Sequence, residues 1–127
     1  MSEDPRRRVG ALGERLAREH LERVGCEILE QNFRCALGEL DIVAADAGYL
    51  IFCEVKTRVA GSRAGPDGPL DAIGAGKRRR LRLLAVEWLR ARGADRPHRG
   101  SLRFDAVGVT LNRAGGLLAL EHVEGAF

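Results

Sequence analysis

The stretch GELDIVAADAGYLIFCEVKT, residues 38–57, contains two apolar segments joined by a short polar turn. Short apolar runs of this kind, bounded by Gly and Asp, predict β-strands over residues 40–45 and 49–57. The pair Ala47-Gly48 between them predicts a two-residue hairpin turn with a positive φ at Gly48. The two strands should therefore pair in antiparallel fashion, and this hairpin decides the arrangement of the residues around it.

The hairpin predicts that two carboxylates face each other. Asp46 would face Tyr49 across the turn, and counting back along both strands then brings Asp41 opposite Glu54. Facing residues have Cβ atoms about 4.5–5.5 Å apart. Carboxylates that close repel unless a cation lies between them. Because oxygen ligands favour hard divalent ions, the pattern predicts a site for Mg²⁺ or Mn²⁺.

Lys56 shares a face with Glu54, because strand side chains alternate and the two residues are two positions apart. Two carboxylates and a lysine are typical of nucleases. The acids hold a metal that polarises a phosphoryl oxygen, and the lysine orients water or offsets developing charge. The same register sets Glu39 opposite Lys56. The alternative is therefore a charged hairpin face in which Lys56 pairs with Glu39 or Glu54, and spacing alone leaves both interpretations open.

The composition indicates one soluble globular domain. The chain has 127 residues, of which 45% are hydrophobic and 31% are charged. No apolar run is long enough to span a bilayer, and the first residues lack the apolar core of a signal peptide, so we expect a cytoplasmic protein with no membrane partner. The three cysteines show no CxxC spacing, so we expect neither a disulfide framework nor a zinc site.

Apolar periodicity predicts the order α-β-β-β-α-β-β. The predicted helices cover residues 9–24, closed by Gly25, and 77–92, and the other predicted strands cover 26–33, 101–111 and 117–123. Residues 1–8 are expected to form a basic N-terminal tail and residues 59–76 a flexible loop. The result is one α/β domain over residues 1–127. Its mixed sheet would combine an antiparallel meander with a parallel pair across the second helix, with the two helices on opposite sides or on one side.

Basic residues cluster although the net charge is only +3. A basic cluster indicates a polyanionic partner, here DNA, and the alternative is a solvated basic face. Cations at the start of a helix oppose its dipole, which is the situation of Lys77 and the arginines that follow it. The expected nucleic-acid-binding residues are Arg34, Arg58, Lys77, Arg78, Arg79, Arg80 and Arg82.

Two further groups of polar residues have simpler interpretations. Glu14 lies at the border of the apolar stripe of its predicted helix, and the helical pattern alone favours a helix-surface charge paired with Arg18 four residues later. The histidines His20, His98 and His122 show no metal-ligand spacing and are expected to be structural.

Five motifs in order resemble the YraN family of small bacterial proteins, which is similar to archaeal Holliday-junction resolvases within the PD-(D/E)xK nuclease superfamily. The resemblance runs from about residue 9 to residue 109. Its motifs are Gly13-Glu14-x-x-Ala17, Asn32-Phe33-Arg34, Gly38-Glu39-Leu40-Asp41-Ile42-Val43-Ala44, Phe52-Cys53-Glu54-Val55-Lys56-Thr57-Arg58 and Arg103-Phe104-Asp105.

This resemblance implies a restriction-endonuclease-like fold with a metal-dependent phosphodiesterase site. Asp41 and Glu54 would be metal ligands together with the Val55 carbonyl, Lys56 would be the catalytic lysine, and Glu14 would complete the site. The expected activity is Mg²⁺- or Mn²⁺-dependent endonucleolytic cleavage of DNA, including branched DNA, by a homodimer. The alternatives are a nucleic-acid-binding module without turnover and a small interaction protein with no nucleic-acid role.

Overall fold

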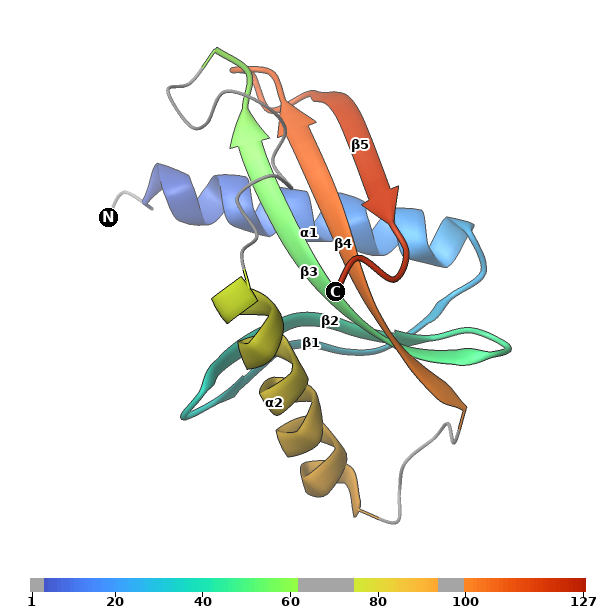
Figure 1. Ribbon diagram of the computed structural model, residues 1–127. Helices are drawn as coiled ribbons and strands as arrows, with labels where there is room; N and C mark the ends of the chain where they lie inside the picture. The colour runs from blue at the N-terminus through green and yellow to red at the C-terminus, as the bar shows by residue number, and fades with distance from the viewer. Residues whose placement is uncertain (1–3, 62–74, 94–99) are drawn as a thin grey trace.

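The computed structural model describes residues 4–61, 75–93 and 100–127, and its chain follows the predicted order α-β-β-β-α-β-β (Figure 1). Of the loop expected over 59–76, residues 62–74 lie outside the described residues. The elements are α1 (Pro5–Arg23), β1 (Glu27–Cys35), β2 (Gly38–Ala45), β3 (Tyr49–Val59), α2 (Ala75–Arg92), β4 (Ser101–Leu111) and β5 (Leu117–Val123).

The five strands form one mixed sheet in the order β1-β2-β3-β4-β5. β3 and β4 are parallel, and the other neighbouring strands are antiparallel, as the sequence predicts. The helices cover opposite faces, which decides between the two arrangements left open above (Figure 1). One core packs α1 residues such as Leu21 against the sheet, and the other packs Trp88 of α2 against Phe52 and Phe104. Neither described helix combines the length and apolar character needed to cross a membrane.

The first helix starts earlier than expected. Asp4 is its N-cap, with a side chain that accepts a hydrogen bond from Arg6 N, and Pro5 occupies the first turn, where its missing N–H costs nothing. The expected tail over residues 1–8 is therefore helical from Pro5 onward. At the other end Gly25 adopts a φ of 100°, and Cys26 N donates to Leu21 O, so the chain turns sharply into β1 as predicted.

The β2–β3 hairpin has the predicted register. Four pairs form, from Ile42 with Cys53 to Ala45 with Leu50. The turn is closed by the Asp46 side chain, which accepts hydrogen bonds from Gly48 N and Tyr49 N. The positive φ expected at Gly48 is wrong, because these bonds stabilise the turn with Gly48 outside the left-handed region.

The two strands separate beyond Ile42. Val55 N donates to the carboxylate of Asp41, so this amide is not available to the ladder. Glu39 is instead paired across β1 with Arg34. The expected placement of Glu39 opposite Lys56 is therefore wrong, and Figure 1 shows the β1–β2 hairpin curving away from the end of β3.

Candidate functional site

Carboxylates from two elements converge where β2 leaves β3. Oxygen atoms of Glu14 on α1 and of Glu39 and Asp41 on β2 all lie within 4.8 Å of one another. Glu54 on β3 is 4% exposed and lines a cavity of about 170 Å³ together with Glu39 and Asp41. The fold thus brings the predicted residues Glu14, Asp41 and Glu54 together and adds Glu39. We call these four residues the acidic site.

Glu14 reaches the site because α1 lies very close to β3 at the preceding residue. Gly13 is buried, and a Cβ at this position would overlap the side chain of Thr57. The expected pairing of Glu14 with Arg18 is wrong, since Arg18 binds Glu22 and the side-chain oxygen of Gln31. The fold directs Glu14 toward the sheet and Arg18 toward β1.

Asn32 is a site residue that sequence reasoning missed. It lies on β1 between Gln31 and Phe33, whose partners on β2 flank Asp41. Its amide nitrogen donates to Glu39 Oε1 at 2.6 Å and to Glu14 Oε2 at 3.1 Å, in the amide orientation that satisfies both groups. Its φ of 55° is the one positive value among described residues other than glycine. The Asn-Phe-Arg motif and the tolerance of Asn for this conformation were the available signals.

Crowding of the acids shifts their protonation. Burial and then the charge of Glu54 raise the pKa of Asp41 to about 8. The hydrogen bond from Val55 N lowers this pKa but does not outweigh them. Burial and then the charge of Glu39 raise the pKa of Glu14, which a hydrogen bond with Asp41 partly offsets. At neutral pH the acidic site therefore retains a proton that a bound cation would displace.

A lysine that sequence reasoning assigned to nucleic acid lies in the site. Lys77 Nζ is 2.8 Å from Glu54 Oε1, and Arg80 from the next turn of α2 lines the same cavity. Among the described residues, α2 is thus the element that brings positive charge to Glu54.

Lys56 does not line the cavity that Glu39, Asp41 and Glu54 share. With Glu14 it lines a separate cavity of about 520 Å³ between the start of α1 and the end of β3. Across the described ranges no ion pair of Lys56 is found, and its expected partners Glu39 and Glu54 are bound to Arg34 and Lys77. The alternative of a simple charged hairpin face with Lys56 paired to either acid is therefore wrong.

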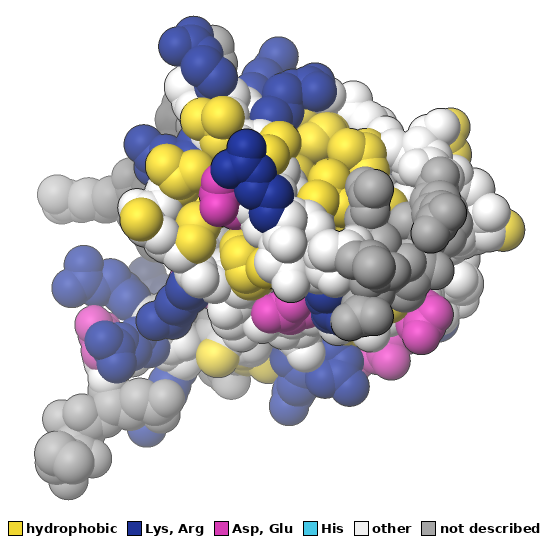
Figure 2. Space-filling model, turned by 90° about the horizontal axis from the view of Figure 1, so that it is seen from below, with side chains coloured by type: hydrophobic (Ala, Val, Ile, Leu, Met, Phe, Trp, Pro, Cys, Tyr) yellow, Lys and Arg dark blue, Asp and Glu magenta, His cyan; other side chains and the backbone are white. Residues whose placement is uncertain are grey.

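The remaining basic residues are dispersed. Arg78 and Arg79 are exposed, Arg58 is half-buried beside Lys56, and the guanidinium of Arg82 lies 4.9 Å from the centre of the Phe104 ring. On the face shown in Figure 2, Lys and Arg side chains are spread around hydrophobic ones rather than gathered in one patch. The expected role of these residues in binding nucleic acid stays a prediction.

A second polar cluster lies on the α1 face of the sheet. Asp105 is fully buried and accepts two hydrogen bonds from Arg103, one from Gly125 N and one at 2.9 Å from His122 Nε2. The second ring nitrogen of His122 is 3.0 Å from His20 Nε2. Burial alone would raise the pKa of Asp105, but the bonds from His122 and Arg103 lower it below its usual range.

This cluster has a structural explanation. It ties β4 to β5 and to the end of α1, so His20 and His122 have the structural surroundings expected of them, while His98 lies outside the described residues. The spacing of the two histidines in the sequence contains no sign of their contact.

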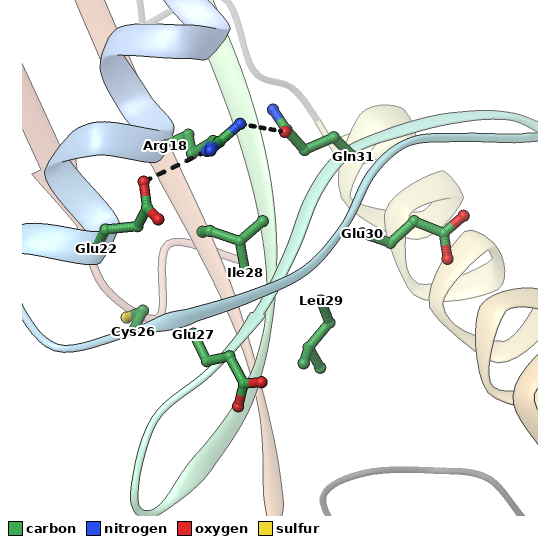
Figure 3. A pocket seen from close by; sticks show the side chains of 8 residues that line it. All are labelled: Arg18, Glu22, Cys26, Glu27, Ile28, Leu29, Glu30 and Gln31. Atoms are coloured by element: carbon green, nitrogen blue, oxygen red, sulfur yellow. Dashed lines mark hydrogen bonds and ion pairs between the residues drawn. The ribbon is translucent and has the colours of Figure 1, made fainter.

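A further cavity of about 640 Å³ is lined by the end of α1 and the start of β1. Figure 3 shows Arg18 between Glu22 and Gln31, so the polar groups there bind one another. It contains none of the predicted site residues.

Comparisons with known proteins agree with the motifs. Residues 13–109 match the family described as "Uncharacterised protein family UPF0102". A UPF0102 protein of Frankia casuarinae is 45% identical over 120 residues, which are 94% of this chain and 95% of that protein. A UPF0102 protein of Pelotomaculum thermopropionicum is 42% identical over 127 residues and 98% of each chain. The matched segment contains all four residues of the acidic site, and the chain belongs to the UPF0102 family, which is the YraN family.

Proposed function

We propose that this protein is a Mg²⁺- or Mn²⁺-dependent endonuclease that hydrolyses phosphodiester bonds in DNA. The observation that carries the proposal is the convergence of Glu14, Glu39 and Asp41 within 4.8 Å, beside the buried Glu54. A fold gains no stability by holding acids together without a counter-charge. Branched or flapped DNA as substrate, a homodimeric assembly and a cytoplasmic location are further parts of the proposal.

The donor set fits a hard divalent cation. All the available side-chain ligands are carboxylate oxygens, which suit Mg²⁺ and Mn²⁺ and not softer metals. The raised pKa of Asp41 supports the same interpretation, because it reflects burial and then the negative charge of Glu54, and a bound cation would offset both. Asp41 and Glu54 would hold the ion, and Glu14 would complete the site from α1.

The ion would polarise a phosphoryl oxygen and lower the pKa of a bound water. Val55 N holds the Asp41 carboxylate in position through its 2.8 Å hydrogen bond. Asn32 fixes Glu14 and Glu39 through its amide. Lys56, next to Glu14 in the adjoining cavity, would orient the attacking water or offset the charge that develops on the phosphate.

The test is cleavage of labelled branched, flapped and single-stranded DNA with Mn²⁺ or Mg²⁺. We expect at least one substrate to be cut, and we expect Asp41→Asn, Glu54→Gln and Lys56→Ala to reduce cutting at least about 100-fold, as for loss of a group that stabilises the transition state. Glu22→Gln is the matched control, because Glu22 is an exposed acid on α1 bound to Arg18. Equal activity, or equal inactivity, of wild type and Lys56→Ala on the whole panel contradicts the proposal.

A DNA-binding module without turnover is the second candidate. The ion pair of Lys77 with Glu54 favours it, since it neutralises one proposed ligand without a metal. This candidate predicts DNA binding whose affinity falls as salt rises, with no metal-dependent cutting. Titration of labelled DNA at two salt concentrations tests it, and absence of binding at both would leave a small interaction protein.

A further inference from the structure

The ammonium group of Lys77 binds Glu54, which is one of the proposed metal ligands. Its Nζ lies 2.8 Å from Glu54 Oε1, and the Glu54 side chain is only 6% exposed. A buried carboxylate without a partner is strongly destabilising. Lys77 is therefore the group that makes a charged Glu54 tolerable in the metal-free fold.

The position of Lys77 on its helix points to this role. It follows Ala75 and Gly76 in the first turn of α2, where no acidic residue offsets the helix dipole. Positive charge at that end is unfavourable for the helix itself. The next residues, Arg78 and Arg79, are exposed, whereas the Lys77 side chain is 36% exposed and turned into the cavity. The contact with Glu54 therefore explains why a lysine occupies position 77, whereas helix stability does not explain it.

We propose that Lys77 is the resident counter-ion of the acidic site and that a divalent cation displaces it from Glu54. The inference rests on the proposed function, since it takes Asp41 and Glu54 as metal ligands. In a cavity of about 170 Å³, a divalent cation bound to Glu54 would lie close to the ammonium group of Lys77, and the two positive charges would repel each other. Lysine suits such an exchange, because its charge is on a flexible four-carbon stem.

The displaced lysine has a second use. Lys77 and Arg80 line the same cavity, so an ammonium group released from Glu54 remains beside a guanidinium at its rim. That pair would meet a phosphate of the substrate once the cation is bound. Lys77 thus stabilises the metal-free site and would afterwards bind the nucleic-acid backbone.

The test compares Lys77→Met with Arg78→Met, which removes the same charge from the exposed neighbour. Calorimetric titration with Mn²⁺ should show binding about tenfold tighter in Lys77→Met than in wild type, as expected when a part-buried ion pair no longer competes. Arg78→Met should differ from wild type less than about twofold, as expected for an exposed charge.

Thermal unfolding supplies a readout that a purely structural lysine would not change. In EDTA, Lys77→Met should melt below wild type, and saturating Mn²⁺ should raise its Tm by more than it raises that of wild type. An equal Mn²⁺-induced rise in both proteins, with equal affinity, overturns the role of Lys77 and leaves the proposed function standing. No Mn²⁺ binding by any of the three proteins overturns both.

Discussion

The backbone amide of Val55 donates a hydrogen bond of 2.8 Å to Asp41 Oδ2, immediately beyond the last β2–β3 pair, Ile42 with Cys53. A side chain thus replaces the backbone acceptor that a continued ladder would supply. The bond favours the charged form of Asp41, yet burial and the charge of Glu54 outweigh it and the pKa is raised to about 8. The hairpin therefore fixes the position of this carboxyl while disfavouring its ionisation.

Asp41→Asn should stabilise the metal-free protein at alkaline pH. Because the folded-state pKa of Asp41 is raised from 3.8 to about 8, its contribution to stability is fully present below pH 3.8 and is lost as the pH rises toward 8. Asparagine keeps an oxygen for Val55 N and carries no charge. At pH 8 in EDTA the Tm should rise by about 3 °C or more, equivalent to about 1 kcal/mol for a domain of this size.

Melting curves of both proteins between pH 5 and pH 9 check this prediction. The gap between the two curves should narrow from pH 9 toward pH 5 and would close only near pH 3.8, where Asp41 is protonated in the folded and the unfolded protein alike. A sharp drop in the Tm of Asp41→Asn at every pH would mean that the carboxylate is needed for folding.

Glu54→Gln should move the titration of Asp41 and change stability little. The neutral side chain removes the largest charge that raises the pKa of Asp41, so that pKa should fall toward its usual range. Stability changes little because two effects offset: repulsion of Asp41 is relieved, while Lys77 loses its partner. Carboxyl-carbon NMR of Asp41 across a pH titration measures the shift, and an unchanged titration would mean that burial alone sets this pKa.

The local part of the site was predictable from the sequence. A two-residue turn and the period of two in strands fix the register, and one register brings Asp41 to Glu54. The resemblance, and not the helical pattern, pointed to Glu14, since the pattern places it on the border of the apolar stripe of α1. The approach of Glu14 to the acidic site depends on the close contact of Gly13 with Thr57 on β3. The periodicity of the helix alone does not predict this contact.

The parts that were not predicted depend on tertiary contacts. Lys77 looked like one cation in a basic run, and only the packing of α2 against the sheet brings it to Glu54. Asn32 lies in the site because its backbone adopts a positive φ. Asparagine tolerates this conformation, but the residue type alone does not determine it. The separation of β2 from β3 after Ile42 leaves Lys56 away from Glu39, because a side chain takes over a hydrogen bond that strand counting assigns to the backbone.

Gly13→Ala should destabilise the fold and disturb the acidic site. The added methyl would overlap the side chain of Thr57, so α1 or β3 must shift, at a cost of about 1–3 kcal/mol typical of overpacking. Gly10→Ala is a matched control on the same helix, because its Cβ would meet nothing within 4 Å. It should stabilise the protein by about 0.5–1 kcal/mol through helix propensity.

Denaturant unfolding of the two variants measures both changes. Opposite signs for Gly13→Ala and Gly10→Ala are expected. Destabilisation of similar size in both would mean that the helix, and not its contact with β3, is sensitive to substitution.

The contact between His20 and His122 should make stability depend on pH below neutrality. Burial, followed by the charges of His122 and Arg23, lowers the pKa of His20 below 6.5. The unfolded chain therefore binds more protons than the folded one as the pH falls below 6.5. The contribution of His20 to stability is present above that pH and is lost as the pH falls through the folded-state pKa of His20. Asp105 on the far side of His122 stays charged, since its own pKa is lowered.

His20→Gln removes the titrating ring and keeps a polar side chain that can donate to His122 Nδ1. The free energy of unfolding of wild type, measured in urea between pH 5 and pH 7.5, should fall toward acid more steeply than that of the variant. Glu19→Gln is the control, because Glu19 is exposed and lies beside His20 on α1. Parallel profiles for wild type and His20→Gln would assign the acid sensitivity of the fold to other groups.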